Sequence, residues 1–187
     1  MNHLHPSKRK LYAFTLVETL VAIAILTLAV TGPYQAIENA IVQAYTARDQ
    51  LIASSLAQEG IEYVYQIRDS NYEYNLSGGT RNWLASLDGT AGSTSTFANC
   101  YGTDGCIVDP TQNTVAACSG NCTPLNMSTT NLYTQATPVG YVSTAFTRTI
   151  LLTSVSDTET QVTSTVSWTT RNVPYSIVIT DSLRNWQ

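Results

Sequence analysis

The stretch that decides the fold is YAFTLVETLVAIAIL, which runs from Tyr12 to Leu26. In the longer segment from Leu11 to Thr31, the only charged residue is Glu18. A helix of these 21 residues is about 30 Å long, which matches the hydrocarbon core of a bilayer. An ionised side chain within that core costs about 2.5–3.5 kcal/mol on insertion scales, so Glu18 requires a partner.

A cluster of three basic residues lies directly before the apolar segment. Its members are Lys8, Arg9 and Lys10. Positive charge is retained on the cytoplasmic side of a membrane-spanning helix. We therefore expect the N-terminus to lie inside the cell and the part of the chain after the helix to lie outside.

Three interpretations of this N-terminal segment compete. A secretory signal peptide would be cut after the apolar run, but the run is long for that and Ala29-Val30-Thr31 is a weak cleavage site. A plain membrane anchor leaves Glu18 unexplained. The third interpretation is a short basic leader that is cut before the apolar run, between Ala13 and Phe14.

From Phe14 onward, the sequence closely resembles the start of type IV pilins and of type II secretion pseudopilins. The residues that carry this resemblance are FTLVE, from Phe14 to Glu18, and TLVAI, from Thr19 to Ile23. In that family, a prepilin peptidase cuts before the Phe and N-methylates it. A Glu at the fifth mature position is the hallmark of the family, and Glu18 is the fifth residue counted from Phe14.

Three further positions bear on the resemblance. Ala13 stands where the family usually has Gly, and its methyl group is small enough for the peptidase site, although it can slow cleavage. Gly32-Pro33 lies near the place of the helix-kinking Pro of the family, slightly early. The segment SLAQEGIE, from Ser55 to Glu62, also looks like the later helix of minor pilins and minor pseudopilins.

The resemblance implies an assembly role for Glu18. Cleavage creates a cation, the α-amine of Phe14, and Glu18 of a neighbouring subunit can pair with it. At 4 Å such a pair is worth about 4 kcal/mol at an effective dielectric constant of 20, before desolvation is subtracted. A buried pair of this kind would fix the register between helices.

The function implied is therefore that of a structural, minor subunit of a type IV pilus or of a type II secretion pseudopilus. Its partners would be other pilin or pseudopilin subunits, prepilin peptidase, the inner-membrane assembly platform and membrane lipid. It would be a single-pass membrane protein before assembly, and then part of a filament at the cell surface or in the periplasm. The alternative function is that of a membrane-anchored adhesin that binds through the cysteine-containing loop described below.

Composition excludes several other functions. Without its first thirteen residues, the chain has no His and no Lys, and six Arg stand against thirteen acidic residues, which gives a net charge of −7. An acidic, lysine-free chain is a poor candidate for nucleic-acid binding. The absence of His excludes Ser-His-Asp and Cys-His catalysis. We expect no enzyme activity, no catalytic residue, no cofactor and no metal site.

The sequence divides into five segments. They are a leader (1–13), a membrane-spanning or filament-core half of a helix (14–33), an amphipathic half of the same helix (34–70), a cysteine-containing variable loop region (71–140) and an antiparallel β-meander (141–187). Apolar residues recur at three- and four-residue spacing up to Ile67, so the helix is expected to end near Asp69–Tyr72 and to span roughly 85 Å. The fold class predicted is α+β and pilin-like.

Three strands are expected in the last segment. Residues 143–155 are rich in Thr, Ile, Leu and Val, and apolar residues alternate over 162–168 and again over 175–179. The expected turns are 157–159 and 171–174. The apolar face of this three-stranded meander would cover the amphipathic half of the helix. Before it, Trp83, Leu84 and Leu87 are expected to form a short turn that docks on the core.

Four cysteines lie in the loop region, at Cys100, Cys106, Cys118 and Cys122. Their even number and their expected place outside the cell favour two disulfides. Local pairing, 100 with 106 and 118 with 122, is favoured, although spacing leaves three connectivities open. A four-cysteine metal site is the weaker alternative, because only the second pair has metal-ligand spacing. Asp104 and Asp109 lie near these cysteines, but their spacing matches no calcium-binding loop.

Overall fold

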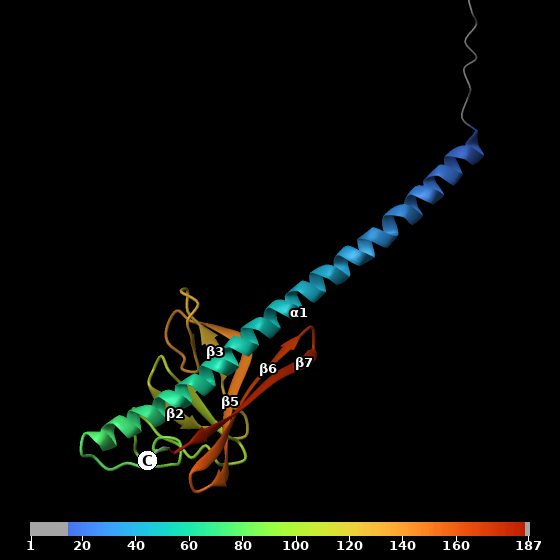
Figure 1. Cartoon of the computed structure of the whole chain (residues 1–187). Coiled ribbons are helices and arrows are strands. Elements are labelled where there is room, and N and C mark those ends of the chain that lie inside the picture. Colours follow the sequence, from blue (N-terminus) through green and yellow to red (C-terminus); the bar gives the residue numbers. More distant parts are fainter. Residues whose placement is uncertain (1–14, 186–187) are drawn as a thin grey trace, which may run out of the picture. The chain divides into compact units, whose positions relative to one another are not determined.

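The computed structural model describes residues 15–185 (Figure 1). The chain divides into two compact units, Met1–Tyr45 and Thr46–Gln187. As predicted, the architecture is α+β and pilin-like, with one long helix that begins near the N-terminus and an antiparallel sheet in the second unit. Outside the described residues lie five that were predicted to act in targeting and processing: Lys8, Arg9, Lys10, Ala13 and Phe14.

The helix, α1, runs from Leu16 to Leu76 and passes through Pro33 without ending. It extends beyond the end that was predicted near Asp69–Tyr72. The reason is the glycine pair that follows it: Gly78 adopts a left-handed φ of 97°. The N–H groups of Gly78 and Gly79 each donate to a carbonyl of the last helical turn, at 3.1 Å. This is the Schellman arrangement, in which glycine rather than the first polar residue ends the helix.

The sheet has seven strands, all paired antiparallel. They are β1 (Cys106–Asp109), β2 (Thr114–Ala117), β3 (Pro124–Met127), β4 (Tyr133–Thr134), β5 (Val142–Ser156), β6 (Glu159–Thr170) and β7 (Val173–Arg184). The strands β5, β6 and β7 form the predicted meander in sequence order. β5 is close to its predicted length, whereas β6 and β7, at 12 residues each, extend well beyond the predicted 162–168 and 175–179. On its other edge, β5 pairs with both β1 and β3.

The four short strands β1–β4 were not predicted, because residues 71–140 were expected to be a loop region. Each contains only two to four residues, so no alternation of apolar and polar residues can develop. Their pairing is decided by the long strand β5, which offers Ile150 to β1 and residues 142–147 to β3. Such pairing at a distance leaves no local signal in the sequence.

One face of residues 46–76 of α1 packs on the sheet in the second unit. Its buried residues follow helical spacing and include Ala53, Leu56, Ala57, Gly60, Ile61, Val64 and Ile67. Buried residues of β5 and β6 alternate along the strands, so that Ile150, Leu152, Val162 and Val166 face the helix side of the core. The predicted turn also docks there: Leu84 and Leu87 are buried in the core and Trp83 packs against it.

Gly60 marks the closest approach of α1 to the sheet. A Cβ atom at this position would lie 2.9 Å from Cδ1 of Ile150 and 3.0 Å from Cδ of Arg148. These distances are shorter than side-chain atoms normally allow, so the buried side chains of Ile150 and Arg148 would have to shift within the core. A glycine in the interior of a helix costs about 1 kcal/mol against alanine, and close packing explains why it is tolerated here.

We therefore predict that Gly60→Ala lowers the free energy of unfolding by about 1–2 kcal/mol, because steric crowding outweighs the gain in helix propensity. Urea unfolding of the purified chain, followed by tryptophan fluorescence, measures this. The matched control is Gly102→Ala, where the nearest atom to a new Cβ is 3.8 Å away. The control should change stability by less than about 0.5 kcal/mol. A Gly60→Ala chain as stable as the wild type would contradict close packing at this point.

Candidate processing and assembly segment

The start of α1 is built around Thr15. The Oγ1 atom of Thr15 accepts a hydrogen bond from the N–H of Glu18 at 3.2 Å, and the carbonyl of Thr15 accepts one from Thr19. Thr15 is thus the N-cap of the helix, and Glu18 is the third residue after it. The pattern Thr-x-x-Glu is the capping-box signature, which was visible in the sequence but was not used. Glu18 in the first turn also interacts favourably with the positive end of the helix dipole.

The threonine hydroxyls in the first half of α1 form hydrogen bonds within the helix. The hydroxyls of Thr19, Thr27 and Thr31 each donate to the carbonyl three residues earlier, at 2.8–3.1 Å. Hydroxyls bonded in this way are tolerated among apolar residues. Among residues 15–185, no side chain forms a hydrogen bond or an ion pair with the carboxylate of Glu18. Within the described part of the chain, the carboxylate of Glu18 thus has no side-chain partner.

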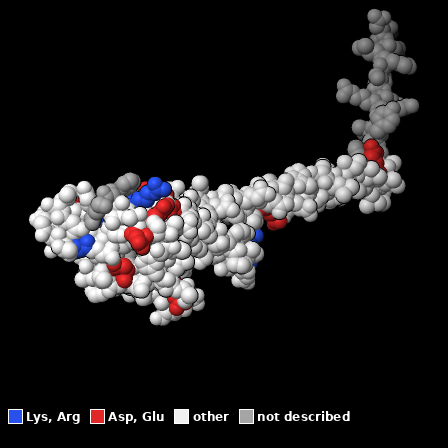
Figure 2. Space-filling view, turned by 60° about the horizontal axis from the view of Figure 1, so that its bottom comes forward, with Lys and Arg blue, Asp and Glu red and all other residues white. Residues whose placement is uncertain are grey.

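Around Glu18, large apolar side chains are exposed on every side of the helix. They include Leu16, Val17, Leu20, Val21, Ile23, Ile25, Leu26, Leu28 and Val30. Figure 2 shows that the surface of this part of the helix is almost free of charge. By length and composition, α1 is able to cross a membrane, and none of its most apolar 18-residue window is buried within the chain. Such a surface fits a lipid bilayer or a bundle of like helices.

Comparison with known proteins adds the deciding observation. A family model described as the prokaryotic N-terminal methylation motif matches residues 8–32. The chain carries a prepilin-type methylation motif. The matched segment includes the basic cluster, Ala13, Phe14 and Glu18, and it ends one residue before Pro33. No curated protein matches the chain, and no solved structure does.

The methylation motif supports a prepilin-peptidase type of substrate and is consistent with the type IV pilin and pseudopilin family. That family is structural rather than enzymatic, and its partners are pilin-family subunits and the peptidase. The apolar helix together with the motif also fits membrane anchoring. Whether Gly32 and Pro33 kink the helix stays a prediction, as do the cleavage position and the role of Glu18 in assembly.

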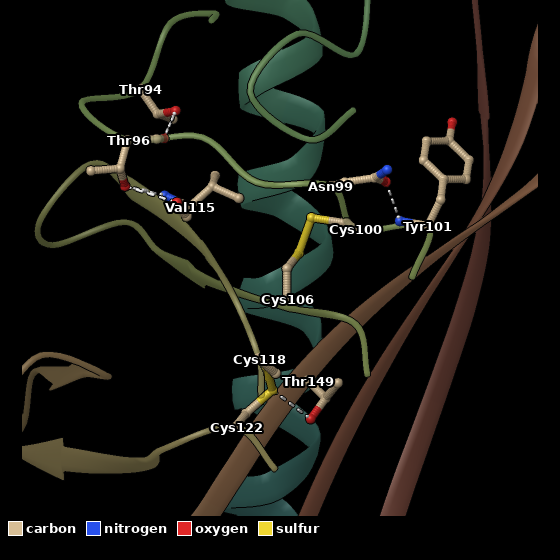
Figure 3. Close-up of a disulfide and its surroundings, with 10 residues drawn as sticks. All are labelled: Thr94, Thr96, Asn99, Cys100, Tyr101, Cys106, Val115, Cys118, Cys122 and Thr149. Atoms are coloured by element: carbon tan, nitrogen blue, oxygen red, sulfur yellow. Dashed lines mark hydrogen bonds between the residues drawn. A yellow bond between two sulfur atoms is a disulfide. The ribbon is translucent and has the colours of Figure 1, made fainter. Parts of the chain in front are cut away.

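The second feature singled out in the sequence is the group of four cysteines (Figure 3). The structure pairs them locally, as the spacing favoured. Cys100 and Cys106 have sulfur atoms 2.01 Å apart, and those of Cys118 and Cys122 are 1.90 Å apart. The first disulfide is fully buried in the core, while Thr149 of β5 donates a hydrogen bond to the sulfur of Cys122 at 3.1 Å. All four thiols are consumed, so none is left to bind a metal.

The carboxylates near the cysteines are used by the fold itself. Asp109 is buried at the end of β1, and one of its oxygens accepts hydrogen bonds from the side chain of Thr134 and from the N–H of Gln135. Burial raises the pKa of Asp109, but these bonds and those from Thr111 and Ala136 outweigh it, so the pKa lies below its ordinary value. Asp104 accepts a hydrogen bond from the N–H of Gly120 at 3.1 Å.

Proposed function

We propose that this protein is a structural subunit of a type IV pilus or of a type II secretion pseudopilus, most similar to the minor subunits. In this proposal it is cleaved between Ala13 and Phe14, methylated on the new N-terminus and assembled through α1. The observation that carries the proposal is the methylation motif at residues 8–32, placed at the start of a helix that is apolar on all sides. The resemblance of Ser55–Glu62 to minor pilins supports a minor role.

The charges of the processed chain support pairing between Glu18 and the α-amine of Phe14. After Phe14, the chain contains no lysine, and its first arginine is Arg48. At 1.5 Å per residue, Arg48 is about 45 Å along the helix from Glu18. Within the apolar segment, the α-amine is therefore the one cation that another copy, or a relative with the same start, offers to Glu18. Because Glu18 is four residues from the amine, pairing would also set the axial offset between neighbouring helices.

The anchor would hold the chain in the inner membrane with the second unit outside, because the basic leader stays in the cytoplasm. When the chain is extracted from the membrane into a filament, the apolar surface of α1 would exchange its contacts with lipid for contacts with neighbouring helices. The carboxylate of Glu18 favours this exchange only where a neighbour supplies a cation, so it selects correctly placed neighbours. The subunit needs no chemistry of its own for this role.

The intact mass of the chain purified from membranes tests the proposal. We expect a mass equal to residues 14–187 plus one methyl group, and a gain of four hydrogens after treatment with a reductant. An Ala13→Gly chain should give the same mass with processing at least as complete, whereas Ala13→Leu should retain the leader. A wild-type mass that still includes residues 1–13 would contradict processing, and the protein would then be an anchored surface domain.

A further inference from the structure

The last strand, β7, forms an open edge of the sheet. It pairs with β6 over its whole length, from Val173 opposite Thr170 to Arg184 opposite Glu159, without a bulge. Among residues 15–185, no other strand pairs with it. In Figure 1 it is the dark red strand beside β6. A long edge strand offers unpaired backbone N–H and C=O groups to another strand.

The backbone groups that face outward follow from two observations at the ends of β7. The N–H of Asn185 donates to the carbonyl of Thr158, which directly precedes β6, so the backbone groups of Asn185 point toward β6. At the other end, Arg171 and Asn172 both have positive φ, 50° and 63°, which makes a type I′ turn whose flanking residue Val173 also faces β6. The backbone N–H and C=O groups of successive residues in a strand point alternately to its two edges. The backbone groups of the even-numbered residues 174–182 therefore point away from β6.

The two ends of this outward row are already closed. At one end, Pro174 has no N–H to offer. At the other end, the N–H of Ser182 donates to the carboxylate of Asp181 at 2.8 Å, and the carbonyl of Ser182 accepts a hydrogen bond from Tyr65 at 3.4 Å. The residues that still offer both an N–H and a C=O group are Ser176, Val178 and Thr180, which are all exposed.

This open stretch lacks the features by which proteins usually block an edge strand. Such features are a charged side chain, above all lysine, a proline, a bulge or a very short strand. No residue from Tyr175 to Thr180 is charged or a proline, and the pairing with β6 shows no bulge. Val178, at the centre, is an apolar side chain that is 57% exposed. The edge is thus open and uncharged over five residues.

The sequence of the open stretch is self-complementary. Ser176-Ile177-Val178-Ile179-Thr180 has the same pattern in both directions, with two hydroxyls outside, two isoleucines inside them and Val178 at the centre. If two copies meet antiparallel about Val178, Ser176 lies opposite Thr180, Ile177 lies opposite Ile179, and Val178 lies opposite itself. Hydroxyl and β-branched pairs of this kind stabilise antiparallel strands. In the same register, Asp181 lies opposite Tyr175, so no like charges oppose each other.

We propose that the edge of β7 is a docking site for β7 of a second copy of this chain, in an antiparallel pair related by a two-fold axis at Val178. The outward N–H and C=O groups of Ser176, Val178 and Thr180 would each bond to the second copy. A two-fold interface is self-complementary by necessity, and this stretch meets that condition. The proposal does not depend on the proposed function. A two-fold pair cannot repeat along a helical filament, so it would join copies outside one.

Cysteine cross-linking of the full chain in membranes tests this pairing. Residues opposite each other as a hydrogen-bonded pair have Cα atoms about 5.5 Å apart, within the range that a disulfide spans. We expect Val178→Cys to form a disulfide-linked dimer on mild oxidation. The matched control is Val155→Cys, whose valine is 58% exposed on β5 and should give no dimer. Equal dimer formation by the two variants would overturn the proposal.

The register is tested with copies that differ from each other. Coexpressed Ser176→Cys and Thr180→Cys chains should cross-link with each other, while neither should cross-link with itself. Adding Val178→Pro to both should abolish the cross-link, because proline removes the central outward N–H but spares the bonds to β6. The same Val178→Pro chain must still contain both native disulfides by mass. A cross-link that survives the proline, or one that forms between identical chains, would overturn the two-fold pair.

Discussion

Replacing Arg148 with methionine is expected to lower the free energy of unfolding of the second unit by about 2–4 kcal/mol. Arg148 lies on β5 and is completely buried. Its Nη1 atom donates to the carbonyl of Leu56 in α1 at 3.0 Å, and its Nη2 atom donates to the carbonyl of Val108 in β1 at 2.7 Å. One guanidinium thus connects the helix with the strands β5 and β1.

The ion pair of Arg148 contributes less than these buried bonds. Its partner Glu59, at 2.8 Å, has a side chain that is 40% exposed, so water screens the attraction. The larger cost of Arg148→Met comes from two buried carbonyls that lose a donor. Methionine retains much of the apolar stem that passes Gly60, so the substitution mainly removes the charge and the hydrogen-bond donors. Glu59→Gln keeps a hydrogen-bond acceptor and should therefore cost less than about 1 kcal/mol.

Urea unfolding of the full chain in detergent, followed by tryptophan fluorescence, measures both effects, because Trp83 and Trp168 pack in the two core clusters of the second unit. The control is Arg184→Met. Its guanidinium is largely exposed and lies 3.7 Å from Glu159, so its loss should change stability by at most about 1 kcal/mol. If Arg148→Met is no more destabilising than Arg184→Met, the buried arginine does not hold the helix to the sheet.

The second large effect is expected from Glu18→Gln, which should reduce the incorporation of the chain into filaments at least about ten-fold, since 1.4 kcal/mol suffices for that factor. Gln has nearly the same size and can take the same third position in a capping box, so the start of the helix is preserved. What the substitution removes is the negative charge that pairs with the α-amine of Phe14.

Incorporation is measured as the share of the chain in sheared filaments against the share left in membranes. The intact mass of the membrane fraction should show that Glu18→Gln is still cleaved and methylated, which separates assembly from processing. The matched control is Glu38→Gln, which removes an exposed carboxylate from the same helix. Chains with this substitution should be incorporated normally. Normal incorporation of Glu18→Gln would exclude charge pairing as the basis of assembly.

Features that depend on local sequence could be predicted, and they include most of the candidate site. The spacing from Phe14 to Glu18 is a local pattern, as is the alternation that predicts β5, β6 and β7. The disulfide Cys118–Cys122 closes a loop of only a few residues. The capping role of Thr15 was equally local, and only its Thr-x-x-Glu pattern had to be recognised.

Features that depend on pairing across the chain could not be predicted in this way. The short strands β1–β4 exist because β5 extends past β6 and offers its other edge. Arg148 is an intermediate case, because Phe146, Ile150 and Leu152 share its side of β5 and are buried. The alternation in the sequence therefore already indicated that Arg148 lies on the buried side of β5. The carbonyls of Leu56 and Val108 that make it tolerable there come from elements 92 and 40 residues away.

The order of the elements along the chain has a consequence for synthesis. A ribosome completes α1 before it begins the strands that cover residues such as Leu56, Val64 and Ile67. Until β7 has been added, Leu183 is missing from the core cluster that includes Val64 and Ile67, so this part of the helix is incompletely covered. Chains cut short within β7 would lack this cover and would present part of the apolar side of the helix to proteases.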